Sequence, residues 1–212
     1  MEKTAIRKIV ESEVLRSFAR QTGRRAVPAA ASNRHVHLCR EDVERLFGNG
    51  YRLTPLRALS QPGQFACEEV LTLHGPKGKL ERIRVLGPER PETQVELSVT
   101  DCFRLGVRPD VRMSGDLEDT PGGRLTGPAG TVELQKGVIV SARHLHLSAA
   151  QAEEYSLKNG DTIRLRAGGQ RAAVFENVIV RSGDGHEMEA HLDIDEANAA
   201  WIKNGDYVEI ID

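Results

Sequence analysis

The sequence has few cysteines, no long apolar segment and no excess of either charge. Its three cysteines, Cys39, Cys67 and Cys102, form no Cys-x-x-Cys pair, which favours a reduced, cytosolic protein. No apolar run reaches membrane-spanning length, and the N-terminus is not expected to be a signal peptide because it lacks an apolar core. The 29 basic and 31 acidic residues nearly cancel, so neither nucleic acid nor a membrane is an expected partner. With 212 residues, the chain can form one large or two small domains.

Histidine is also scarce, with seven residues, but four of the seven lie in two copies of one short motif. Arg-His-Val-His-Leu at 34–38 recurs as Arg-His-Leu-His-Leu at 143–147. In an extended strand, each copy places two imidazoles on one face and two apolar side chains on the other. Neutral imidazole is the commonest metal ligand and suits zinc, copper, iron and nickel. Two copies therefore favour a metal site over two half-buried strands whose histidines meet water or backbone.

The flanks of the two motifs also match, which indicates an internal duplication. Residues 39–47 and 148–157 both have the pattern of a short helix, and Ser148 with Gln151 predicts a capping box. We expect both helices to stop at an Asn-Gly pair, at 49–50 and at 159–160, because glycine permits the conformation that ends helices. The repeated unit is thus predicted to be strand, short helix, turn and strand.

The rest of the chain is predicted to be mainly β. Short strands alternate with glycine-rich turns, which is typical of small barrels or sandwiches. A hairpin is expected from 69–73 and 82–86, and further strands at 95–99, 131–134, 137–140, 162–165, 173–175, 178–180 and 207–211.

Residues 1–20 have the pattern of an amphipathic helix. The apolar stripe consists of Ile6, Ile9, Val10, Val14 and Phe18. Such a helix would pack on its own domain or on a dimer mate, or it would serve as a detachable tag that binds another protein. Its acidic residues argue against a mitochondrial transit peptide.

Other ligand candidates are weaker when read from the sequence alone. Glu96 shares a strand face with Gln94 and Ser98, where a glutamate is usually solvated. His191 shares its face with Glu187, Glu189 and Asp193, which is either a plain hydrated face or a histidine held by a carboxylate behind a metal. Cys39 could join a metal site, but a structural thiol is favoured. His74 and His186 have the surroundings of loop residues.

Five motifs in one order, from about residue 20 to the C-terminus, resemble the PduL-type phosphotransacylases, also called phosphate propanoyltransferases. They are Ser32–Leu38, Gln61–Ala66, Leu86–Pro88, Arg112–Asp116 and Arg143–His146. The resemblance implies two small β-barrels with short capping helices and two zinc ions at their interface. It also implies interconversion of acyl-CoA plus phosphate with acyl phosphate plus coenzyme A. An N-terminal extension in this family targets the enzyme into the lumen of a bacterial microcompartment in the cytoplasm, through shell or cargo proteins.

Carried over by motif, the resemblance assigns roles to individual residues. One zinc would be held by His35, His37 and Glu96, and the other by His144, His146 and His191. Arg90 would bind phosphate as the catalytic arginine, and coenzyme A would contact Ser32, Arg57, Arg84, Leu86 and Asn198. A polar pocket wall would comprise Gln61, Gln64, Gln94, Ser114 and Arg181. The implied domains are residues 1–20 as the targeting helix, 21–33 plus 142–212 as one barrel, and 34–141 as the other.

The expected reaction is direct attack of phosphate on the thioester. Cys67 and Cys102 are alternative nucleophiles for a covalent route, but neither has a base partner in a motif. A metal-dependent hydrolase of thioesters or phosphoesters, and a non-catalytic shell or scaffold component, are the alternative classes. We expect a homodimer or higher oligomer, and the sequence leaves the choice between acetyl and propanoyl groups open.

Overall fold

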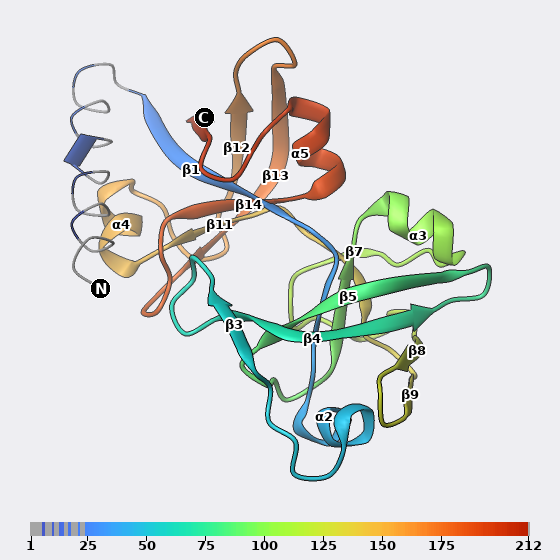
Figure 1. The fold of residues 1–212 in the computed structure, drawn as a ribbon. Coiled ribbons are helices and arrows are strands. Elements are labelled where there is room, and N and C mark those ends of the chain that lie inside the picture. The colour runs from blue at the N-terminus through green and yellow to red at the C-terminus, as the bar shows by residue number, and fades with distance from the viewer. Residues whose placement is uncertain are drawn as a thin grey trace. The chain divides into compact units, whose positions relative to one another are not determined.

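The computed structural model describes residues 6, 10, 13, 14, 17, 21 and 24–211. The chain is mainly β and divides into two compact units (Figure 1). The barrel unit comprises residues 1–31, 143–192 and 196–212, and the sheet unit comprises residues 32–142 and 193–195. The predicted fold class is confirmed. The predicted domain boundaries, which concern parts of the chain that would fold separately, stay a prediction. Within the described residues, no helix is both long and apolar enough to cross a membrane.

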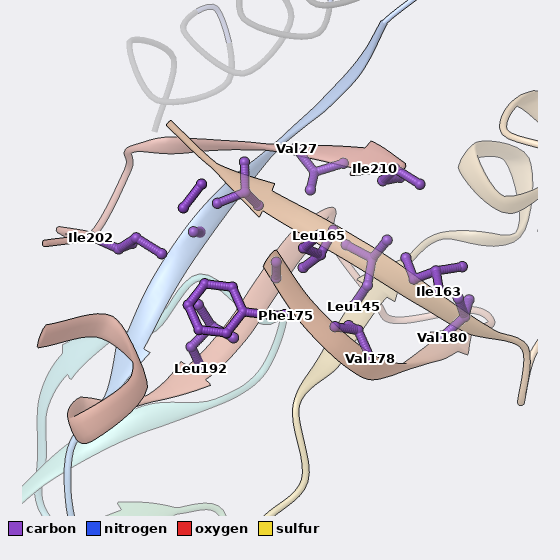
Figure 2. Packing of buried hydrophobic residues seen from close by; sticks show 14 of the residues in the cluster. Val27, Leu145, Ile163, Leu165, Phe175, Val178, Val180, Leu192, Ile202 and Ile210 are labelled. Carbon is purple, nitrogen blue, oxygen red and sulfur yellow. The ribbon is translucent and has the colours of Figure 1, made fainter. Parts of the chain in front are cut away.

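The barrel unit is a closed six-stranded barrel with the strand order β1-β14-β11-β13-β12-β15. Its elements are β1 (Arg25–Ser32), β11 (His144–Leu147), α4 (Ala149–Glu154), β12 (Thr162–Ala167), β13 (Ala173–Ser182), β14 (Glu189–Asp193), α5 (Ile194–Ala200) and β15 (Tyr207–Ile211). Alternate residues of β12 turn inward, so Leu165 is buried while Arg166 is exposed. Leu145, Leu165 and Val180 are fully buried in the apolar core that Figure 2 shows. Truncation of such a leucine to alanine typically costs about 2–5 kcal/mol.

The sheet unit is one curled nine-stranded sheet, which takes the place of the second small barrel. Its strands follow the order β7-β10-β6-β2-β5-β4-β8-β9, and β3 pairs with β4. Its elements are β2 (His35–His37), α2 (Arg40–Phe47), β3 (Pro55–Ala58), β4 (Phe65–His74), β5 (Lys79–Gly87), β6 (Gln94–Leu97), α3 (Val99–Leu105), β7 (Val111–Arg112), β8 (Gly123–Thr126), β9 (Thr131–Leu134) and β10 (Val138–Ser141). The predicted hairpin is formed by β4 and β5.

The two units repeat the same four-strand arrangement, which confirms the predicted duplication. β2 pairs antiparallel with β6 and parallel with β5, and β5 pairs antiparallel with β4. In the barrel unit, β11 pairs antiparallel with β14 and parallel with β13, and β13 pairs antiparallel with β12. Each histidine motif therefore lies in a central strand, where the alternate apolar residues Val36 and Leu145 are fully buried.

Some local predictions were wrong, for reasons of helix capping. α2 ends at Phe47 because Gly48, with φ +115°, is its C-cap, and α4 ends before Tyr155. The Asn-Gly pairs at 49–50 and 159–160 lie in turns after the two helices. The predicted capping box of Ser148 and Gln151 is present.

The predicted strand at 95–99 is also shorter than expected. It ends at Leu97, because the Ser98 hydroxyl accepts a hydrogen bond from the Asp101 amide and starts α3. The two strands predicted at 173–175 and 178–180 are one continuous strand, β13, in which Asn177 adopts φ +57°. Hydrophobic alternation therefore identified many of the strands but not their ends, and it missed β1, β3, β7 and β8.

Candidate functional site

In the sheet unit, His35, His37 and Glu96 bring three ligand atoms within 4.8 Å of one another. Nε2 of His35 lies 3.5 Å from one Glu96 carboxylate oxygen, and Nε2 of His37 lies 3.9 Å from the other. The opposite ring nitrogens are anchored on the backbone, since Nδ1 of His35 is 2.8 Å from the Asn33 carbonyl and Nδ1 of His37 is 3.2 Å from the Leu86 carbonyl. These anchors direct both Nε2 atoms toward Glu96.

The electrostatics of this cluster differ between its two histidines. Burial, together with the charges of His35 and Arg90, lowers the pKa of His37 to about 3. Burial also acts to lower the pKa of His35, but attraction and hydrogen bonding from Glu96 outweigh burial and raise it. A metal ligand must be a neutral imidazole, so His37 is held in the ligand form at neutral pH.

In the barrel unit, the rings of His144, His146 and His191 form a second cluster whose ligand atoms also lie within 4.8 Å of one another. The ring centroids of His144 and His146 are 4.7 Å apart, and each lies 4.9 Å from that of His191. Nδ1 of His146 is buried without a hydrogen-bond partner, which is costly unless something binds there. Burial and the neighbouring His144 and His191 lower the pKa of His146 to about 2.

Both donor sets fit a zinc-like ion. Ligand nitrogens and oxygens about 2.0–2.1 Å from a tetrahedral zinc lie about 3.4 Å from one another, close to the 3.5 Å between Nε2 of His35 and the Glu96 carboxylate. Each set offers three protein ligands, which leaves a coordination position for substrate or water, as in catalytic zinc sites. The unpartnered, buried His146 nitrogen gives an independent reason for an ion in the barrel unit.

Cys39 and His186 lie outside the two sets of three candidate ligands. Cys39 belongs to neither donor set and occupies the N-cap position of α2, with its amide donating to Thr93. His186 lies outside regular structure, as predicted, but its ring centroid is 4.6 Å from that of His146. This contact was not predicted from the sequence. The only signal in the sequence was the position of His186, five residues before His191.

Arg90 is connected to the sheet-unit cluster by a chain of hydrogen bonds. Its guanidinium donates to the Ser114 hydroxyl at 2.7 Å, and the Gln94 amide donates to the same hydroxyl at 2.8 Å. The Gln94 amide also donates to Glu96 at 2.6 Å and accepts from the Gly115 backbone N–H at 2.7 Å. Four predicted residues, Arg90, Ser114, Gln94 and Glu96, therefore form one polar network.

The remaining predicted residues of the sheet unit lie on β3 and β5, in the turn between β3 and β4, and at the end of β1. Arg84 stands opposite His35 on β5 and donates to the Cys67 and Glu68 carbonyls, while Arg57 is exposed on β3, which pairs with β4. Leu86 is half-buried on β5. Ser32 is the last residue of β1, and the buried Gln61 and half-buried Gln64 form a turn.

In the barrel unit, the predicted residues Arg181 and Asn198 take different positions. Arg181 pairs with His146 across β13 and β11. Its charge adds to burial in lowering the pKa of His186. Asn198 is on α5, and its carbonyl accepts from the Trp201 amide.

A pocket of about 690 Å³ opens in the sheet unit beside Phe65 and Pro88. It is lined by Arg40, Gly50, Arg52, Leu53, Phe65, Pro88 and Glu89, none of which was predicted as a site residue. The residues that line this pocket are therefore not those of the buried polar network. The candidate site is the polar network and not the pocket.

The two cysteines considered as nucleophiles are buried in the sheet unit. Burial raises the pKa of each thiol, Cys67 and Cys102, to about 11. The carboxylates of Glu69, near Cys67, and Asp101, near Cys102, raise these pKa values further. Both thiols thus stay protonated at neutral pH, which argues against a covalent route because the thiolate is the nucleophile.

Comparison with known proteins gives one consistent result. The family model for phosphate propanoyltransferase matches residues 28–203. The chain is 53% identical over 182 residues to a phosphate propanoyltransferase of Thermotoga maritima, covering 85% of this chain and 87% of the relative. It is 50% identical to that of Rhodopseudomonas palustris, with 87% and 81% covered, and 42% identical to that of Listeria monocytogenes, with 100% and 97% covered. The chain belongs to the phosphate propanoyltransferase family.

Proposed function

We propose that this protein is a phosphate acyltransferase that interconverts acetyl- or propanoyl-CoA plus phosphate with the acyl phosphate plus coenzyme A, and that it binds one zinc ion at each histidine cluster. The observation that carries the proposal is the hydrogen-bonded chain from Arg90 through Ser114 and Gln94 to Glu96. It sets a guanidinium beside a candidate metal site, and phosphate is a ligand that both groups bind well.

The residues of the sheet unit have distinct tasks in this reaction. Arg90 offers a planar fork of donors that matches two phosphate oxygens and holds them in one orientation. The Gln94 amide is fixed at both ends, so it holds Glu96 and Ser114 without rearrangement during turnover. Ser32, Arg57, Arg84 and Leu86 are the proposed contacts of coenzyme A in this unit.

In the proposed step, a phosphate oxygen attacks the carbonyl carbon of the thioester. A carbon–oxygen bond forms, the carbon–sulfur bond breaks, and coenzyme A leaves as a thiolate that takes up a proton, while the hydrogen phosphate that is transferred gives up its proton to solvent. Zinc, when bound, supplies a Lewis acid that offsets negative charge on phosphate or on the departing sulfur. Because phosphate is strongly hydrated, the fixed donors of Arg90 also replace part of its water shell before attack.

The decisive experiment is a thiol-release assay with acetyl-CoA and propanoyl-CoA, each with and without phosphate. We expect thiol release only with phosphate, together with acyl phosphate trapped as its hydroxamate. Thiol release that needs no phosphate and yields free acid would identify a hydrolase instead. No turnover in either direction, with both clusters loaded, would favour the scaffold alternative.

We further propose that the enzyme acts in the lumen of a bacterial microcompartment and that residues 1–20 bind a shell or cargo protein. The support is the exposure of the apolar stripe, since Ile6, Val10 and Val14 are helical and more than half exposed. Ile9 and Phe18 of the same stripe lie outside the described residues. The family model also begins only at residue 28, beyond this segment.

A further inference from the structure

Glu189 contacts a candidate metal ligand in the barrel unit without being one of the three ligands. It precedes His191 by two residues on β14, so both side chains project from the same face. A Glu189 carboxylate oxygen lies 2.7 Å from Nε2 of His191, and the two side chains are only 15% and 22% exposed. Glu189 also stands opposite His146 in the pairing of β14 with β11.

The sheet unit has a residue in the equivalent position. Gln94 precedes Glu96 by two residues on β6, stands opposite His37, and donates to Glu96 at 2.6 Å. The chemistry is complementary in the two units. Where the third ligand is a carboxylate, its neighbour is an amide donor, and where the third ligand is an imidazole, its neighbour is a carboxylate acceptor.

Charge gives a second reason for a carboxylate at position 189. The sheet-unit cluster contains one anionic ligand, Glu96, whereas the barrel-unit cluster consists of three neutral imidazoles. A divalent cation there would lack an anionic ligand, and Arg181, opposite His146, adds positive charge. A carboxylate that is hydrogen-bonded to His191 but does not bind the cation offsets this charge and increases the basicity of the His191 imidazole.

We propose that Glu189 is a positioning residue that accepts a hydrogen bond from Nε2–H of His191, fixes the orientation of the ring and leaves Nδ1 to bind the cation. This inference rests on the proposed metal binding of the barrel-unit cluster. Loss of such a partner typically lowers metal affinity about 10- to 100-fold.

The test uses the full-length chain with His35→Ala and Glu96→Ala, so that only the barrel-unit cluster keeps three ligands. In this parent, Glu189→Ala, Glu189→Gln and the control Glu153→Gln are compared. Glu153 is exposed on α4 and carries the same charge. The affinity for Co²⁺ is measured by competition with a chelator, the visible spectrum of bound Co²⁺ is recorded, and circular dichroism checks the fold.

We expect Glu189→Ala to weaken Co²⁺ binding about 10- to 100-fold. Glu189→Gln should weaken it less, because the amide oxygen still accepts the hydrogen bond while the charge is lost. Glu153→Gln should bind as the parent does, and all spectra should keep the same coordination pattern. Unchanged affinity in Glu189→Ala would overturn the inference. So would a changed coordination number in both Glu189 variants, since Glu189 would then be a ligand. A parent that binds no Co²⁺ would instead overturn the proposed metal site itself.

Discussion

Arg34 donates to the buried carboxylate of Asp101 across 2.6 Å, and so joins the first histidine motif to α3. Arg143 makes the equivalent contact with Glu196 of α5 in the barrel unit. Each arginine immediately precedes the first histidine of its motif, and each acid follows the third candidate ligand by five residues. In each unit, the arginine of the repeated motif therefore holds the strand that carries the two histidines against the helix that follows the third candidate ligand.

Replacing Arg34 with alanine should lower the free energy of unfolding of the metal-free protein by about 1–3 kcal/mol, because the Asp101 carboxylate would stay buried without its cation. The side chain of Asp101 is only 4% exposed. Urea unfolding measures the change. The control Lys79→Ala removes an exposed ion pair with Glu81 and should cost less than about 1 kcal/mol. Equal losses in the two variants would show that the Arg34 contact adds no more stability than a surface pair.

The wild-type protein, purified without chelators, should contain about two equivalents of a zinc-like ion per chain, because each cluster offers three ligands and an open position. His144→Ala and His35→Ala should each lose about one equivalent and most of the activity. His74→Ala is the control, because His74 contacts Thr126 and belongs to neither cluster. Elemental analysis measures the content. Full activity with far less than one equivalent would contradict a role for metal.

Replacing Arg90 with alanine should raise the KM for phosphate or lower kcat, with little change in metal content. Loss of a charged hydrogen bond of this type costs about 1.5–3 kcal/mol, or roughly 10- to 100-fold in kcat/KM. Arg90→Lys should recover only part, because it keeps the charge and loses the fork. Initial rates at varied phosphate separate KM from kcat. The control Arg124→Ala removes an exposed arginine that pairs with Glu133, and phosphate kinetics like that control would refute the assignment.

The sequence was sufficient to predict much of the candidate site, because the two-residue period of a strand places His35 and His37 on one face whatever the surroundings. The central position of β2 and β11 follows from the same alternation, since Val36 and Leu145 need burial on the opposite face. The third ligands were harder to recognise. Glu96 is buried with the Gln94 amide donating to it, and Gln94 also donates to the hydroxyl of Ser114, which is distant in sequence.

Helix starts and nonlocal contacts account for the rest. Val99 continues the alternation of β6, but Ser98 caps α3, so a local hydrogen bond overrides the strand pattern. His186 has turn-forming neighbours, and its approach to His146 depends on how the chain between β13 and β14 folds back. Neither feature has a periodic signal, and both depend on contacts that periodicity does not encode.

Cys67 and Cys102 should react slowly with iodoacetamide in the native protein at pH 8, because burial holds the pKa of each thiol near 11. Cys39, which is partly exposed, should be labelled first. Mass spectrometry of peptides gives the labelling rate at each site. Cys67→Ala and Cys102→Ala should keep most of the thiol-release activity. Abolished turnover in a variant that is folded and metal-loaded would revive the covalent route.

Deleting residues 1–20 should leave specific activity nearly unchanged and reduce self-association, because the deletion removes the exposed side chains of Ile6, Val10 and Val14 and none of the candidate site. Val10→Asp with Val14→Asp in the full chain is a milder change, and both side chains are more than half exposed. Light scattering measures the oligomer. A fluorescent protein fused to residues 1–20 should enter compartments in a host that makes the shell, in the manner of a helix docking into a groove, and the double aspartate variant should not. A deletion that abolishes folding, with the aspartate variant equally unstable, would show that this segment belongs to the core.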